Sequence, residues 1–140
     1  PISFPVSAWG LRLLLPRVQS GGRTLLAEAF AAAGGRVVEV AAYETRCPES
    51  WPAAALLALE RRQLAAITFS SGKTVDHTAL LLERHFGADW LELLAEARLV
   101  SIGPQTSNRC RALLGRVDAE ADPHDLDGVL QACITALGRP

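Results

Sequence analysis

LVSIGPQTS, residues 99–107, is the segment that decides the fold this sequence predicts. Its apolar run leads into Gly103-Pro104 and then into NRCRALLG, which has the composition of a helix. Glycine suits a sharp turn out of a strand, and proline suits the first turn of a helix, where the N–H it lacks would be unpaired. Thr106 and Ser107 then fall beside backbone donors that attract anions.

Other segments have the same order of strand, polar turn and helix. They include LRLLLPRVQSGGRTLLAEAF, residues 11–30, and AAITFSSGKTVDH, residues 65–77. Further strands are expected at residues 37–41 and, weakly, within residues 115–121 around Val117. Alternating strands and helices predict a flavodoxin-like doubly wound parallel sheet of about five strands with helices on both faces. Ligands of such sheets bind at the carboxyl ends of the strands.

Length and composition are those of one ordinary domain. We interpret residues 1–10 as a linker or edge extension and residues 11–140 as the α/β domain. With 49% hydrophobic residues and a net charge of −1, the composition argues against disorder and supports neither nucleic-acid nor membrane binding. The start shows no signal-peptide pattern and no initiator methionine, as expected for the middle of a longer chain. Three scattered cysteines indicate free thiols in a reduced, cytoplasmic compartment.

Several familiar site motifs are absent. GKT at residues 72–74 is no phosphate loop, because the required glycine is replaced by Ile67. No dinucleotide fingerprint follows a strand, and no histidine has zinc-ligand spacing with a cysteine. We therefore expect no metal and no cofactor, and we interpret His77, His85 and His124 as solvated surface residues.

Hydroxyl side chains follow two of the expected strands. Ser70, Ser71 and Thr106 are ordinary turn and cap residues when taken one at a time. In a doubly wound sheet they would share one edge, with backbone donors pointing outward, and that edge suits a ligand with several carboxylates or phosphates. Tyr43, the only tyrosine, follows another strand and could donate a proton or close a loop.

Four blocks of the sequence resemble a known family. They are LLLPRVQSGGRTLLAEAFAAAGGRVVEVAAYET, ITFSSGKTV, SIGPQTSNRCRALLG and the closing DPHDLDGVLQACITAL. In this order they resemble the C-terminal half of uroporphyrinogen-III synthases over residues 11–137. The resemblance implies a cytoplasmic lyase of tetrapyrrole biosynthesis that uses no cofactor. Its substrate would be hydroxymethylbilane, a polycarboxylate linear tetrapyrrole, which is cyclised to uroporphyrinogen III with inversion of ring D and loss of water.

The resemblance also implies roles for individual residues. Tyr43 matches the family's tyrosine, which is proposed to assist departure of the substrate hydroxyl. Ser71 and Thr106 match hydroxyl residues of the substrate cleft. Their neighbours Ser70, Gly72, Lys73 and Gly103 complete the expected substrate-binding set, in which Lys73 either pairs with a substrate carboxylate or faces water.

The chain departs from the family because the N-terminal half of the two-domain enzyme is missing. Residues 11–45 and 65–137 would belong to different domains of a full-length synthase. The two pieces could close into one domain, or two chains could exchange pieces in a swapped homodimer hinged at residues 46–52. We expect little synthase activity from the isolated chain. The alternative function is a non-catalytic flavodoxin-like binding module.

Overall fold

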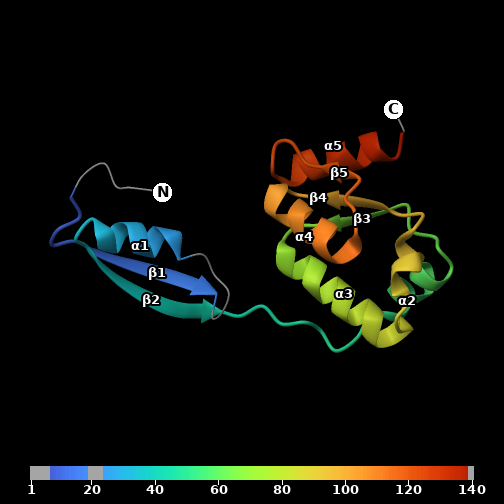
Figure 1. The fold of residues 1–140 in the computed structure, drawn as a ribbon, viewed down its shortest axis with the longest axis horizontal. Coiled ribbons are helices and arrows are strands. Elements are labelled where there is room, and N and C mark those ends of the chain that lie inside the picture. Colours follow the sequence, from blue (N-terminus) through green and yellow to red (C-terminus); the bar gives the residue numbers. More distant parts are fainter. Residues whose placement is uncertain (1–6, 19–23, 139–140) are drawn as a thin grey trace. The chain divides into compact units, whose positions relative to one another are not determined.

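The computed structural model describes residues 7–18 and 24–138, and the chain divides into two compact units (Figure 1). Unit 1 is Pro1–Arg46 and unit 2 is Cys47–Pro140. The boundary lies at the start of the proline-containing segment 46–52. Most of the expected linker and the turn after the first strand lie outside the described residues.

Unit 1 is a strand–helix–strand motif. Strand β1 (Arg12–Val18) pairs in parallel with β2 (Arg36–Tyr43), and helix α1 (Leu25–Ala32) connects them. Helix α1 ends at a glycine pair whose first member, Gly34, has a positive φ of 92°. Such a backbone favours glycine, which has no Cβ, and it turns the chain back into β2.

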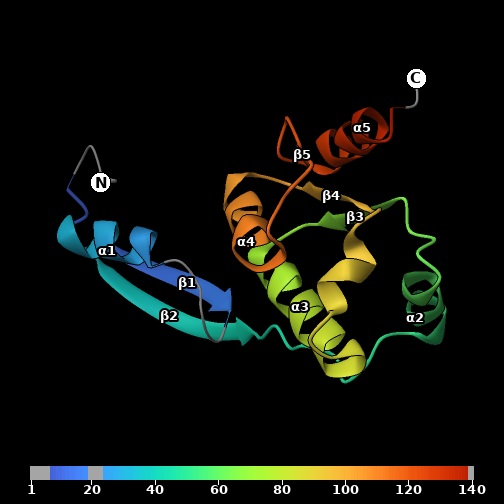
Figure 2. The same ribbon diagram turned by 45° about the vertical axis from the view of Figure 1, so that its right-hand side comes forward.

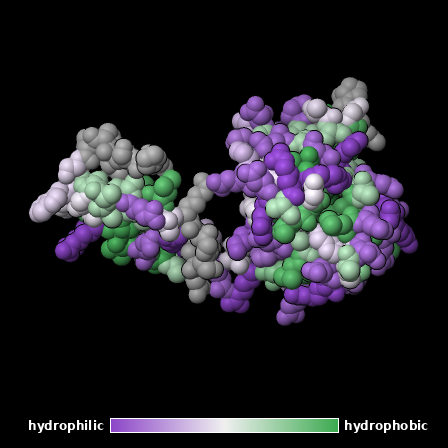
Figure 3. Space-filling view, in the orientation of Figure 1, coloured by the Kyte–Doolittle hydropathy of each residue, from purple (hydrophilic) through white to green (hydrophobic). Residues whose placement is uncertain are grey.

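One face of the β1–β2 sheet is not covered by the described residues. Leu14, Val38 and Val40 occupy alternating positions on this face, and their exposed fractions are 62%, 51% and 44%. The space-filling view shows apolar atoms gathered on this unit (Figure 3). Unit 1 therefore has a helix on one side of its sheet and exposed apolar side chains on the other.

Unit 2 contains a three-stranded parallel sheet in the order β3-β4-β5. Figures 1 and 2 show α5 on one face of this sheet, with α3 and α4 on the other. The elements of unit 2, in chain order, are α2 (Ala53–Glu60), β3 (Ala66–Phe69), α3 (Gly72–Phe86), the 3-10 helix η1 (Trp90–Leu94), β4 (Arg98–Ser101), α4 (Pro104–Leu114), β5 (Ala119–Glu120) and α5 (Leu126–Ala136).

The α/β class, with parallel strands and connecting helices, is confirmed. The five strands of the described residues lie in two sheets of two and three strands, rather than in the single sheet that the sequence predicts. The connection after β2 explains this difference. Residues 44–52 form neither helix nor strand, and proline at positions 48 and 52 removes backbone donors there. The chain thus leaves the first sheet without a helix that would return it to that sheet.

The core of unit 2 is built around β4 and the helices that cover it. Leu99, Val75, Leu82 and Cys110 are fully buried in one cluster. Trp51 packs against this cluster, and its indole Nε1 has no hydrogen-bond partner in the described part of the chain. None of the described helices is long and apolar enough to cross a membrane.

Cys110 is a core residue, as the sequence indicates, and we expect its thiol to be unreactive. Burial raises the pKa of this thiol from 9.0 to about 11, against the opposing effect of the Arg111 charge. Because only the thiolate is nucleophilic, alkylation at pH 8 should be at least about 100-fold slower at Cys110 than at Cys47 and Cys133. Mass spectrometry of the native chain checks this. Equal labelling of all three thiols would contradict it, and unfolded protein serves as the control.

Candidate functional site

The three strands of unit 2 end level with one another. Phe69 lies opposite Ser101 in the β3–β4 ladder, and Ser101 lies opposite Glu120 in the β4–β5 ladder. The turns after these strands therefore meet at one edge, which we call the strand-end rim. Its described residues are 70–73, 102–106 and 121–125.

The turn after β3 forms a capped helix start. Ser71 is the N-cap of α3, where its hydroxyl accepts a hydrogen bond from the Thr74 backbone N–H at 3.2 Å. The Thr74 hydroxyl in turn accepts from the Ser71 N–H at 3.3 Å. This capping box determines where α3 begins, so Ser71 has a structural role beside any role in binding.

The other predicted residues of this turn include exposed side chains. Ser70 and Lys73 are exposed, and neither side chain pairs with another described residue. Gly72 opens α3, and a Cβ there would lie 3.8 Å from Arg109 side-chain atoms, which is ordinary contact. Lys73 is thus a free cation on the described surface of the rim.

The turn after β4 differs from the prediction in two respects. Gly103 has φ −176° and ψ 179°, an extended backbone open to any residue, so no sharp glycine turn occurs there. Thr106 is 5% exposed rather than open on the rim, because it lies within the first turn of α4 as that helix packs on the sheet. Its hydroxyl forms no hydrogen bond within the described ranges, but it is not fully buried, because Trp51 Nε1 is the one fully buried side-chain polar atom without a partner there.

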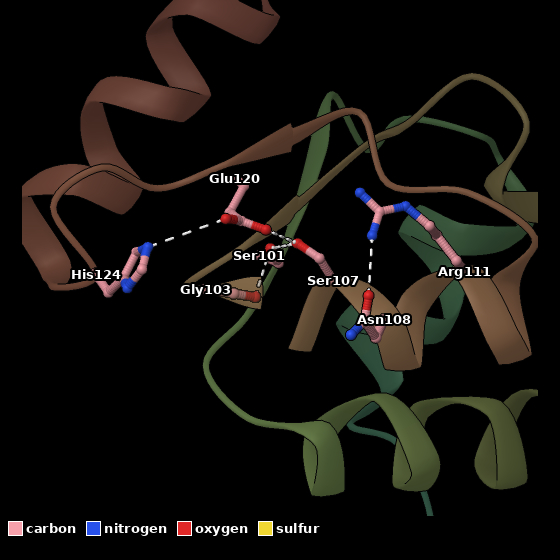
Figure 4. A network of polar contacts seen from close by, with 7 residues as sticks. All are labelled: Ser101, Gly103, Ser107, Asn108, Arg111, Glu120 and His124. Atoms are coloured by element: carbon pink, nitrogen blue, oxygen red, sulfur yellow. Dashed lines mark hydrogen bonds and ion pairs between the residues drawn. The ribbon is translucent and has the colours of Figure 1, made fainter. Parts of the chain in front are cut away.

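A polar network joins β4, α4 and β5 behind this turn (Figure 4). The Ser101 and Ser107 hydroxyls, both fully buried, are 2.5 Å apart. Ser107 also donates a hydrogen bond to Oε2 of Glu120. The other oxygen of Glu120 is 3.9 Å from Nε2 of His124. One carboxylate therefore links two buried hydroxyls to an imidazole on the surface.

Sequence reasoning does not identify His124 of the rim, or Glu120 and Ser101 at the strand ends behind it, as site residues. The strand that places these residues together is hard to predict, because the residues around it are mostly small or charged and β5 is only two residues long. The sequence would identify Glu120 and His124 as site residues only if it also showed that β5 ends beside the ends of β3 and β4. Within the described ranges, no group of three or more His, Cys, Asp or Glu residues could hold a metal ion.

Tyr43 belongs to unit 1. It is the last residue of β2, where a register shift places it opposite Val18, and it is 62% exposed. Like the unit 2 residues, it therefore lies at the carboxyl end of a parallel strand. Its role in catalysis stays a prediction.

Comparison with known sequences identifies the family. The family described as uroporphyrinogen-III synthase HemD matches residues 8–131. The chain belongs to the uroporphyrinogen-III synthase family. A uroporphyrinogen-III synthase from Synechococcus elongatus is 46% identical over 129 residues, which cover 92% of this chain and 49% of that protein. The chain thus spans about half the length of this curated relative.

Solved structures of uroporphyrinogen-III synthases have a similar fold. The Helicobacter pylori enzyme matches with a TM-score of 0.61 and 17% identity, over 89% of this chain and 53% of the other. A mutant of the Thermus thermophilus enzyme matches with a TM-score of 0.59 and 21% identity, over 95% and 52%. The family resemblance drawn from the sequence is confirmed, and a generic flavodoxin-like binding module is not favoured.

Proposed function

We propose that this chain carries the C-terminal half of a uroporphyrinogen-III synthase site, acting in the cytoplasm on hydroxymethylbilane. The reaction is a cyclisation with loss of water and inversion of ring D. The strand-end rim of unit 2 is the observation that supports this proposal. It gathers hydroxyls, the starts of α3 and α4, and the cation Lys73 along one edge, and these groups suit a polycarboxylate.

The rim residues would position a flexible substrate. Ser70, Ser71 and Thr106 offer hydroxyls, and the backbone at Gly72 and Gly103 opens helices whose first N–H groups are unpaired within the helix. Lys73 would pair with a carboxylate. Holding the reacting ends of a linear molecule close together supplies much of the rate enhancement of a cyclisation.

Tyr43 would act on the leaving hydroxyl. Its phenol would donate a proton as the hydroxyl departs, and this loss leaves an azafulvene-type electrophile. Attack by the final pyrrole then gives a spiro intermediate, which breaks and recloses with the last ring inverted. Because this mechanism needs both units, we propose that residues 11–45 and 65–137 belong to different domains of the working enzyme, completed by a first half or by exchange between two chains.

We expect the purified chain alone to form uroporphyrinogen III at least about 100-fold more slowly than a full-length synthase, because half of the positioning surface is missing. Adding the first half of the Synechococcus elongatus relative as a separate polypeptide should raise the rate at least about tenfold. Chromatography of the oxidised product, resolved by isomer, measures both rates.

Two further results would test the proposal. The same mixture with Tyr43→Phe should lose at least about 90% of the restored rate. A normal enzymatic rate from the isolated chain would contradict the expectation of a weak fragment. No type III product from the completed mixture would contradict the proposed function itself.

A further inference from the structure

His124 differs from the other two histidines in its surroundings. A Cβ built on Gly103 would lie 3.5 Å from Cγ and 3.6 Å from Nδ1 of His124, so the imidazole lies against the turn that opens α4. Its side chain is 55% exposed. The ring therefore lies on the solvent side of the strand-end rim, beside the start of α4, whose first turn contains Thr106.

Glu120 orients this ring. One carboxylate oxygen accepts the Ser107 hydrogen bond, and Ser107 is itself held by Ser101, so the carboxylate cannot turn freely (Figure 4). The other oxygen lies 3.9 Å from His124 Nε2. Within the described residues Nδ1 has no hydrogen-bond partner, and in the protonated ring it is a donor available to a ligand.

Acidic residues flank His124 in the sequence. Asp122, Asp125 and Asp127 surround it in the sequence, and Asp125 caps α5 by accepting from the Gly128 N–H at 2.8 Å. His124 is the one basic group in the stretch 119–127, all of which the structure describes. Its imidazole is thus the one basic side chain of this stretch that can donate a hydrogen bond to a carboxylate.

We propose that His124 is an additional substrate-binding residue, which donates from Nδ1 to a carboxylate held across the Gly103–Thr106 turn while Glu120 fixes the ring. This inference rests on the proposed function, because it deepens the same site. The ligand class is a carboxylate side chain of a tetrapyrrole.

The test uses uroporphyrin III, a polycarboxylate tetrapyrrole, as a fluorescent probe titrated into the whole chain. His124→Gln should weaken its binding by about fivefold, since an amide cannot supply the charge-assisted hydrogen bond that a protonated imidazole donates. His85→Gln is the matched control. His85 is exposed in the last turn of α3, roughly 20 Å along the helix from the rim, and its substitution should change the Kd by less than about 1.5-fold.

Two further measurements separate binding from structure. His124→Lys supplies a cationic donor and should keep the Kd within about twofold of that of the unmodified chain, which a purely structural role would not predict. In a ¹H–¹³C spectrum of the imidazole Cε1 positions, the His124 peak should shift with the same Kd as the fluorescence, while the His85 peak stays in place. Thermal unfolding of each variant checks that folding is intact.

Different results would overturn the inference about His124 and the proposed function. The inference is overturned if His124→Gln binds the probe as tightly as the unmodified chain, if His85→Gln weakens binding equally, or if the unmodified chain does not bind the probe. The proposed function fails separately if the probe binds in a manner that depends on His124 but the completed two-part mixture makes no type III product.

Discussion

Replacing Gly128 with alanine is expected to lower the free energy of unfolding by about 3 kcal/mol, the upper range for overpacking a folded interior. A Cβ at this position would lie 1.8 Å from the carbonyl oxygen of Pro123. That oxygen belongs to the backbone and also accepts from the Asp125 N–H at 2.9 Å, so it cannot swing aside as the end of a side chain would. The loop carrying His124 must therefore shift, or the first turn of α5 must unwind.

The expected loss of stability at position 128 is opposite to the effect of a glycine-to-alanine change in an open helix. In an open helix the same change stabilises by up to about 1 kcal/mol, because alanine has the higher helix propensity. Gly72→Ala is the matched control, since its Cβ would meet only ordinary contact with Arg109, and we expect it to be neutral or slightly stabilising. Urea unfolding of both variants measures the change in the free energy of unfolding at each position. A stability gain at position 128 would show that the loop at Pro123 yields easily.

Replacing Ser107 with alanine is expected to cost about 2 kcal/mol, the range for removing a buried hydrogen-bonding partner. The hydroxyl is fully buried between the Ser101 hydroxyl and the Glu120 carboxylate. After its loss, Ser101 retains only a 3.4 Å hydrogen bond to the Gly103 carbonyl, and Glu120 loses the contact that orients it. Chemical denaturation, with the midpoint and slope fitted together, measures the loss.

Ser70→Ala is the control for this substitution. Ser70 is exposed at the same rim, and its removal should change stability by less than about 0.5 kcal/mol. The Ser107→Ala variant should also bind uroporphyrin III more weakly if Glu120 orients His124. Equal stability of the two alanine variants would mean that the buried network adds nothing to folding.

The sequence alone was sufficient to predict the individual strands and helices of the turns that carry the rim. Continuous apolar runs predicted β3 and β4, and the polar turns after them placed the starts of α3 and α4 within two residues of where these helices begin. Helix starts are visible in a sequence because capping and the proline preference act between residues a few positions apart. The family was also recognisable, since its blocks combine these turns in a fixed order.

The weak fifth strand illustrates where local patterns fail. It was expected within residues 115–121, and β5 occupies only Ala119–Glu120 of that range, a pairing of two residues beside β4. So short a strand forms because a neighbour offers hydrogen bonds, and no periodicity reveals it. Glu120 and His124 were therefore not recognised as neighbours of the turn after β4.

The sequence by itself determined the alternation of strands and helices, the hydroxyl-rich turns and the family, because each depends on residues close together in the chain. Only the tertiary structure decided that the strands divide into two sheets, that Thr106 is buried, and that Ser107 reaches Glu120. These features depend on which segments pack against each other, and packing joins residues distant in the chain through burial and hydrogen bonds that local spacing does not encode.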